Sequence, residues 1–381
     1  MLDRWSTDAA KHDLGSFVIV YSIDNSLRVK ALVEILALIT PFVALAASLA
    51  VILAIRFLDV VEREPKRLIA LAMLLGAIST LPSIIWQVLS ESVWQSFGAG
   101  EAVVNAITTV IDAPISEELF KGLALLILIL TQRRKLDSLT DFLICACAVG
   151  IGFELVENIL YQWSTFDQDN QVAGWIDEFN NRTLASAGSH AFFSVWLGLA
   201  GWILFQANSK AIKPLAAAAL CLSMLLHAFN NLAAVMVQAG PDDVTLPINR
   251  LGTTLGIVSN HLTLALFIGL IGVAILRDVH FLIDYGSLIQ ARLLRNTDNP
   301  YSDSLLVLKN LTNPINHVMA HSARSWRWSQ HPDKRLTQRS AYREFAKLAL
   351  ASAQRGPSDS RDVLARSSCI DQGLKLIQSL A

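Results

Sequence analysis

The chain has 381 residues, of which 53% are hydrophobic and only 17% are charged, and its formal net charge at pH 7 is −1. Ordinary soluble domains contain about 25% charged residues, so this composition argues against a soluble enzyme. The apolar residues are gathered in runs long enough to cross about 30 Å of hydrocarbon. Segments such as "PFVALAASLAVILAI" lack the polar stripe of a helix on a soluble protein. We therefore predict an all-α polytopic membrane protein.

In chain order, residues 1–30 form a short extension whose single apolar run, "FVIVY", is too short for a cleavable signal peptide. That run suits either an interfacial strand or a helix. About seven transmembrane helices follow, at residues 31–55, 68–89, 103–131, 139–162, 184–207, 214–237 and 250–276. Connectors rich in Lys and Arg alternate with connectors that have few. The positive-inside rule therefore places the N-terminus outside and the C-terminus in the cytoplasm.

Residues 277–381 form the predicted tail, which follows a transmembrane domain of residues 31–276. The tail contains 15 Lys and Arg against 9 Asp and Glu, a net charge of +6. Apolar residues recur at helical spacing in two stretches, at Tyr342, Phe345 and Leu348 and at Ile370, Leu374 and Ile377. We interpret the tail as a solvated helical appendage. Its basic excess favours contact with anionic lipid over nucleic acid, because no nucleic-acid-binding fold accompanies the charge.

Ionisable residues lie deep within four consecutive predicted spans. A carboxylate at the centre of a bilayer costs roughly 2.5–3.5 kcal/mol, so four of them are rarely kept without a function. Residues four apart share one face of a helix, and each span offers such a pair. The polar residues of the four spans are Glu117, Glu118 and Lys121; Glu154, Glu157 and Asn158; His190 and Ser194; and His227 and Asn231. Their depths overlap, so we expect one cluster in the middle to outer half of the bilayer.

Pro114 stands just before the first acidic pair. Proline interrupts a helix because it lacks an N–H group and its ring clashes with the preceding turn. We therefore expect a break or kink there. Ser116 would then be the N-cap of the following helix, and Glu117 and Glu118 would lie in its favourable first turn.

The cluster suits general acid–base chemistry. Neighbouring carboxylates repel each other, so one is expected to be protonated and another ionised, which supplies an acid and a base at one site. An ionised carboxylate can take a proton from water as the water attacks a carbonyl, and His227 with Asn231 can stabilise the resulting oxyanion. Two Glu and two His could also hold zinc. The "HExxH" pattern is absent and Lys121 would oppose a cation, so no cofactor is predicted and zinc is the second choice.

Four motifs in order resemble the PrsW family of intramembrane proteases. "EELFK" resembles that family's Glu-Glu-x-x-Lys motif, and "GFELVEN" resembles its Phe-x-x-x-Glu-Asn stretch. "RTLASAGSH" is similar to its segment from Arg182 to His190, and "LLHAFNN" to its closing His-x-x-x-Asn. The order and spacing are also similar to the wider group that includes the CAAX prenyl endopeptidases. The resemblance covers about residues 105–236.

The resemblance implies an intramembrane endopeptidase in a bacterial inner membrane. Its water-activating base would be Glu117 or Glu118, and Glu157 and His190 would assist it. The implied substrate is a membrane-anchored regulator such as an anti-sigma factor. The chain departs from the short bacterial form in its N-terminal extension, an additional span and its tail, and Phe142 stands where the family usually has glycine. The alternatives are a proton-coupled transporter that uses the cluster as a relay, a buried structural ion pair, and a silent scaffold.

Overall fold

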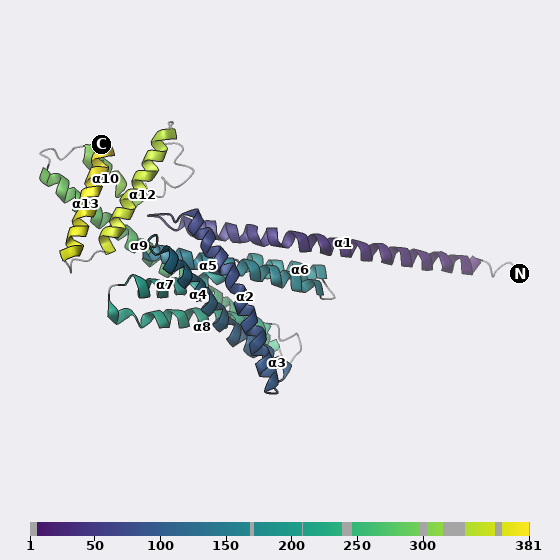
Figure 1. Cartoon of the computed structure of the whole chain (residues 1–381). Coiled ribbons are helices and arrows are strands. Elements are labelled where there is room, and N and C mark those ends of the chain that lie inside the picture. Colours follow the sequence, from purple (N-terminus) through teal and green to yellow (C-terminus); the bar gives the residue numbers. More distant parts are fainter. Residues whose placement is uncertain are drawn as a thin grey trace. The chain divides into compact units, whose positions relative to one another are not determined.

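A computed structural model of the chain describes residues 6–167, 171–207, 209–237, 246–296, 303–314, 332–354 and 360–380. All regular structure within these ranges is helical and none of it is a strand, as the composition predicts (Figure 1). The elements are α1 (Ser6–Phe57), α2 (Lys66–Ser96), α3 (Glu101–Ile107), the π-helix η1 (Thr108–Asp112), α4 (Ala113–Gln132), α5 (Leu139–Ser164), η2 (Thr165–Asp167), α6 (Gln171–Glu178), the π-helix η3 (Phe179–Ala185), α7 (Ser189–Phe205), η4 (Lys210–Ile212), α8 (Leu215–Val237), α9 (Leu246–Asn296), α10 (Asp303–Leu311), α12 (Pro332–Gln354) and α13 (Ser360–Leu380).

Six helical segments in the described part of the chain are long and apolar enough to cross a membrane. They are Arg28–Phe57, Lys66–Ser96, Leu139–Ser164, Gln171–Phe205, Lys210–Val237 and Pro247–Leu294. The remaining predicted span, residues 103–131, is also helical, because α3, η1 and α4 follow one another without a gap. It falls outside the six because α4 carries three charged residues, Glu117, Glu118 and Lys121.

Two helices extend beyond the predicted membrane boundaries. Helix α1 begins at Ser6, so "FVIVY" is helical and the predicted extension joins the first span as one helix. Helix α9 continues to Asn296, twenty residues into the predicted tail. Hydropathy indicates where an apolar stretch ends, whereas a helix ends where its backbone hydrogen bonds stop. A hydrophilic sequence without a breaker therefore continues the helix.

The chain divides into two compact units. The first comprises Met1–Ala50 and Leu155–Ala187, and the second comprises Val51–Glu154 and Gly188–Ala381. Within the first unit, Trp175 of α6 is buried and donates its indole N–H to Oγ1 of Thr40 at 2.9 Å. This hydrogen bond fastens the short amphipathic helix α6 to α1.

The core of the second unit is built around α5, whose residues 142–149 are almost completely buried. A Cβ atom added at Gly152 would lie 1.9 Å from the carbonyl oxygen of Met73, and one added at Gly76 would lie 2.0 Å from that of Val149. Helices α2 and α5 therefore cross with their backbones in contact. Small residues allow such close approach between membrane helices. This crossing places the polar residues of α2 and α5 at fixed positions.

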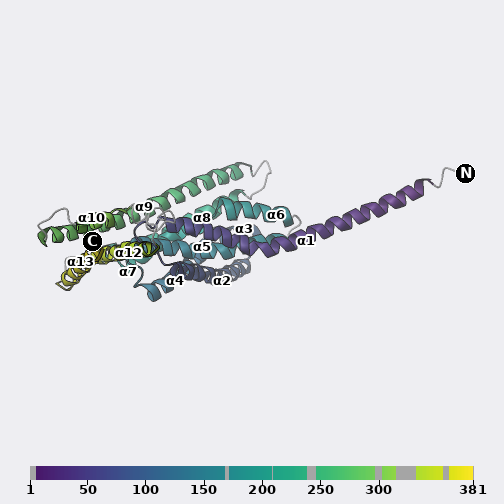
Figure 2. The same cartoon turned by 90° about the horizontal axis from the view of Figure 1, so that it is seen from above.

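Helices α10, α12 and α13 lie beside the end of α9 (Figure 2). Together these helices form a second hydrophobic cluster. Tyr285, Phe345 and Ile377 are buried at its centre. The apolar positions predicted for the two tail helices all lie in or against this cluster, so that prediction is confirmed. Val61, from the loop between α1 and α2, is buried in the same cluster. The tail helices thus pack on the connector of the first two spans and are more than a solvated appendage.

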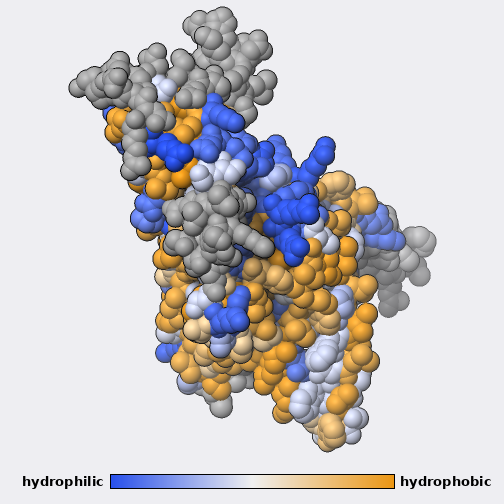
Figure 3. Space-filling view, turned by 60° about the vertical axis from the view of Figure 1, so that its left-hand side comes forward, coloured by the Kyte–Doolittle hydropathy of each residue, from blue (hydrophilic) through white to orange (hydrophobic). Residues whose placement is uncertain are grey.

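Hydrophobic side chains cover much of the lower part of the face seen in Figure 3. Large apolar residues such as Leu74, Leu123 and Val273 are at least half exposed on the membrane helices. A soluble protein rarely exposes extended apolar surface. A protein in lipid presents it to hydrocarbon, and the second unit has this surface on α2, α4 and α9.

Candidate active site

The acidic pair of α4 follows a π-helical turn. Residues Thr108–Asp112 form η1, and α4 starts directly after it with Pro114 in its first turn. The helical path therefore continues through this point by way of a π turn, so the helix does not break at Pro114. A proline in the first turn of a helix needs no intrahelical donor. Ser116 is correspondingly not an N-cap. It lies inside the helix, with its hydroxyl donating to the carbonyl of Ala113 at 3.1 Å.

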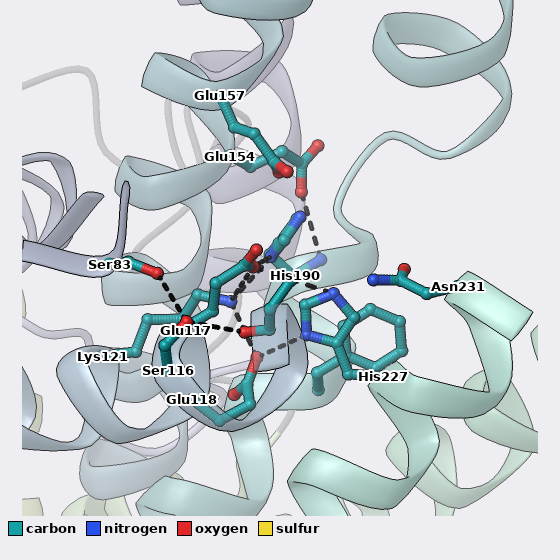
Figure 4. Close-up of polar contacts among 12 residues, drawn as sticks. Ser83, Ser116, Glu117, Glu118, Lys121, Glu154, Glu157, His190, His227 and Asn231 are labelled. Atoms are coloured by element: carbon teal, nitrogen blue, oxygen red, sulfur yellow. Dashed lines mark hydrogen bonds and ion pairs between the residues drawn. The ribbon is translucent and has the colours of Figure 1, made fainter. Parts of the chain in front are cut away.

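Lys121 is the cation at the centre of the cluster (Figure 4). Its Nζ atom lies 2.7 Å from Oε1 of Glu118 and 3.6 Å from Oε2 of Glu117. The same atom lies 2.7 Å from Nδ1 of His190, on α7. The structural alternative, a buried ion pair of Glu117 with Lys121, is present at the longer distance, and the shorter contact is with Glu118. One ammonium therefore compensates two carboxylates and holds an imidazole.

Glu118 has partners on both of its carboxylate oxygens. Oε1 accepts from Lys121 and lies 3.1 Å from Nδ1 of His227, while Oε2 accepts from the hydroxyl of Ser223 at 2.8 Å. Both His227 and Ser223 are on α8. Because a carboxylate beside a lysine only accepts hydrogen bonds, it fixes the imidazole proton of His227 on Nδ1. The lone pair of His227 is then on Nε2.

Glu117 directs one oxygen toward both histidines. Its Oε2 atom lies 3.9 Å from Nδ1 of His190 and 3.8 Å from Nε2 of His227. Oε1 accepts from the side-chain amide of Gln87, on α2, at 3.4 Å. Glu117 and the two histidines are each at most 4% exposed. The carboxylate thus faces two adjoining imidazoles in a site shielded from bulk solvent.

Aromatic rings enclose the two histidines. The His190 ring lies 5.4 Å from the ring of Phe153 and meets His227 edge-on at 5.1 Å. Phe193 stacks on His227 with centroids 4.7 Å apart, and the Lys121 ammonium lies 4.2 Å from the Phe153 centroid. Such rings add cation–π attraction and keep water away from the charged groups.

Two neutral residues of the site, both on α2, do not follow from the sequence pattern. Ser83 lies 3.2 Å from the hydroxyl of Ser116, and Gln87 donates to Ser83 at 3.2 Å in addition to Glu117. They stand four apart in an otherwise apolar stretch, "LPSIIWQV". This is the spacing that revealed the other polar stripes. The four-residue spacing is therefore the sequence signal for these two residues. Neutral side chains, however, do not stand out in a membrane span as charged ones do.

Other predicted site residues have partners of their own. Asn231 donates to the carbonyl of Thr109, in η1, at 2.9 Å. In the first unit, Arg182 forms an ion pair with Glu157 at 2.9 Å and donates to Oδ1 of Asn158 at 3.4 Å. These three residues form a polar group of that unit.

Comparison with protein families identifies the chain. Residues 64–276, more than half of the chain, match the family described as PrsW family intramembrane metalloprotease. The chain belongs to the PrsW family. Comparison with curated proteins and with solved structures gave no match. This PrsW-family protein is an integral membrane hydrolase that acts on membrane proteins within the bilayer, and the transporter alternative is not favoured.

The PrsW-family description implies a metal ion, and the donor set can be tested for one. Among the described residues, Glu117, His190 and His227 offer ligand atoms that all lie within 4.8 Å of one another. Two ligands at about 2.05 Å from a tetrahedral zinc ion are about 3.4 Å apart, and the distances from Glu117 to the two imidazoles are 3.8 and 3.9 Å. A carboxylate behind the Nδ1 atom of His227 is the usual support of a histidine ligand. The donors fit a divalent ion, provided that the Lys121 ammonium leaves His190 and stays with Glu118.

Proposed function

We propose that this PrsW-family protease hydrolyses peptide bonds at the cluster of Glu117, His190 and His227. The observation that carries the proposal is the convergence of these side chains from α4, α7 and α8 on one buried point, where Oε2 of Glu117 faces both imidazoles. A carboxylate in this position can take the proton of an attacking water. The Lys121 ammonium, 3.6 Å from the same oxygen, can stabilise the oxyanion that forms at the scissile carbonyl.

Glu118 and Lys121 then have supporting roles. Both oxygens of Glu118 accept hydrogen bonds from fixed partners, so this carboxylate is a poor proton acceptor and a good anchor for His227. Lys121 neutralises the negative charge that two adjacent carboxylates place in an apolar site. Of the two glutamates predicted as the base, Glu117 is therefore the one that we assign to proton transfer.

Glu117, His190 and His227 are also the residues that would hold a divalent metal, with zinc as the expected ion. A metal held there would supply Lewis acidity toward the scissile carbonyl. Glu118 orients His227 through its Nδ1 atom, and the Gln87 amide holds the second oxygen of Glu117. The glutamate-only mechanism predicted from sequence is the alternative: there Glu117 is the general base, whereas with a metal bound it would be a ligand.

The remaining features of the sequence prediction extend the proposal. Glu157, Asn158 and Arg182 match family motifs, and we assign them a supporting role in the reaction or in substrate binding. The relation to CAAX prenyl endopeptidases and the anti-sigma-type substrate rest on the resemblance alone. An outside N-terminus and a cytoplasmic tail follow from the distribution of basic residues.

A cleavage assay tests the proposal. The protein is reconstituted in liposomes with a panel of single-pass membrane proteins, and cleavage is followed by gel and mass spectrometry. Glu117→Gln keeps the size and hydrogen-bonding capacity of the side chain but removes its basicity. We expect it to lower the cleavage rate by about 10²–10⁴-fold, the usual contribution of a positioned general base.

Glu101→Gln is the matched control. Glu101 is exposed at the start of α3, in the same continuous helical stretch as Glu117. The control should cleave at the wild-type rate. Wild-type cleavage by Glu117→Gln would overturn the assignment of the base.

A further inference from the structure

Helix α7 begins one residue before His190 and lacks a capping side chain of its own. Its N-cap is Gly188, which has a left-handed backbone with φ of 85°. Glycine adopts this conformation without the strain that a Cβ atom would cause. The first N–H groups of a helix have no intrahelical acceptor and need one from elsewhere. In α7 these include the N–H of His190 itself.

Glu154 of α5 supplies that acceptor. Its Oε1 atom accepts from the N–H of Gly188 at 2.8 Å, and its Oε2 atom accepts from the N–H of His190 at 3.2 Å. The side chain is buried. A buried carboxylate that bridges two backbone donors makes charge-assisted hydrogen bonds, which are stronger than neutral ones. It is also favoured by the partial positive charge at the start of a helix. Figure 4 shows this contact on the opposite side of His190 from Glu118.

Two neighbours of Glu154 on α5 fix the rest of His190. A Cβ atom added at Gly150 would lie 2.5 Å from the carbonyl oxygen of His190, so the backbones of α5 and α7 meet at this residue. The ring of Phe153 lies 5.4 Å from the imidazole. The N–H, the carbonyl and the ring of His190 are thus all located by one turn of α5. The sequence alone predicted that Glu154 belongs to the polar cluster, but it did not indicate that Glu154 locates His190.

We propose that Glu154 is a positioning residue for His190: its carboxylate fixes the backbone at the start of α7, and thereby the place and orientation of the imidazole opposite Glu117. Its oxygens bind the backbone, so it has no part in proton transfer. The kinetic consequence rests on the proposed function, whereas the effect on the imidazole does not.

An ordinary capping role must be told apart from positioning, and the chain contains a matched control. Asp141 is buried near the start of α5, and one of its oxygens accepts from the N–H groups of Asp137 and Ser138, both at 2.8 Å. Asp141→Ala removes two backbone hydrogen bonds, as Glu154→Ala does, together with side-chain hydrogen bonds to Glu64 and Asp137, and it does so at a helix start that carries no site residue. Both variants should therefore lower the melting temperature.

The deciding measurement is the imidazole ¹⁵N spectrum of histidine-labelled protein in nanodiscs, with the His190 signals assigned by their loss in His190→Asn. We expect Glu154→Ala to shift or split the His190 signals, and Asp141→Ala to leave them unchanged. Glu154→Gln keeps one acceptor oxygen and should give a smaller shift. Where cleavage is measurable, Glu154→Ala should lower kcat by about 10–100-fold, as loss of an outer support of a site histidine does, and leave KM within about twofold.

Unchanged His190 signals in Glu154→Ala would overturn the proposal, and so would equal shifts in Asp141→Ala. If Glu154→Ala does not fold, Glu154→Gln decides by the same criterion. If the chain cleaves no substrate at all, the proposed function fails, but the spectra still test the placement of His190.

Discussion

Nδ1 of His227 lies 3.1 Å from Oε1 of Glu118, and this contact determines which nitrogen of the imidazole faces the site. The carboxylate holds a proton on Nδ1, so the lone pair on Nε2 points toward Glu117, 3.8 Å away. Glu118 therefore acts through His227, and the two adjacent glutamates have different tasks.

Glu118→Gln should disrupt the site without removing a reacting atom. The amide cannot pair with Lys121, whose ammonium then keeps only the longer contact with Glu117, and the three charge-assisted hydrogen bonds of Glu118 are lost or weakened. Hydrogen bonds to charged groups contribute about 1.5–3 kcal/mol each. We expect a clear loss of thermal stability and a fall in the cleavage rate of about 10–100-fold. Ser223→Ala removes only one of these hydrogen bonds and should cost about 1.5–3 kcal/mol. Thermal unfolding in detergent measures both effects. Equal losses of stability in the two variants would contradict the central role of Glu118.

Metal content can be measured independently of activity. We expect the protein purified without chelator to carry about one zinc ion per chain, measured by elemental mass spectrometry, since three suitable donors converge. His227→Ala should lose the metal, and the exposed control Glu101→Gln should keep it. Chelation should abolish cleavage, and added zinc should restore it. Full cleavage by a metal-free preparation would instead support the glutamate-only mechanism.

The sequence predicted the main residues of the site because charge in a membrane span is conspicuous. Glu117, Glu118, Lys121, His190 and His227 stand out against leucine-rich surroundings, and helical spacing assigns each of them to one face. The neutral partners were missed for the opposite reason. Gln87 and Ser223 do not differ from the occasional polar residue that any membrane helix tolerates.

The tail was predicted in its local structure and not in its packing. Helical spacing located the apolar faces of α12 and α13 correctly, but spacing does not tell what covers a face. Val61 fills part of the cluster, and Glu62 pairs with Arg343 at 3.3 Å and with Lys347 at 3.8 Å. These contacts link residues about 280 positions apart, which no local pattern reveals.

The backbone contact of α2 with α5 predicts a strong effect of one added methyl group. In Gly152→Ala the new Cβ atom would lie 1.9 Å from the carbonyl of Met73, so the helices must separate. We expect a loss of about 1–3 kcal/mol, as for overpacked cores, and reduced cleavage because both helices carry site residues. Gly269→Ala on α9 is the control, since its Cβ atom would meet no neighbour within 4 Å. A melting temperature of Gly152→Ala equal to that of this control would contradict the close crossing.

The loop between α1 and α2 should make stability depend on pH. Burial raises the pKa of Glu64 to about 8 and that of Glu62 to about 7, whereas the carboxyl pKa in the unfolded chain is about 4.5. The folded state thus binds more protons, so the stabilisation is fully present below pH 4.5 and is lost as pH rises through 7 to 8. One pKa unit corresponds to about 1.4 kcal/mol, so Glu64→Gln should flatten the decline and raise the melting temperature at pH 8–9. Thermal unfolding in detergent between pH 5 and 9 measures this, with Glu101→Gln as the exposed control. A Glu64→Gln profile that parallels the wild type would show that Glu64 ionises as freely in the folded protein as in the unfolded chain.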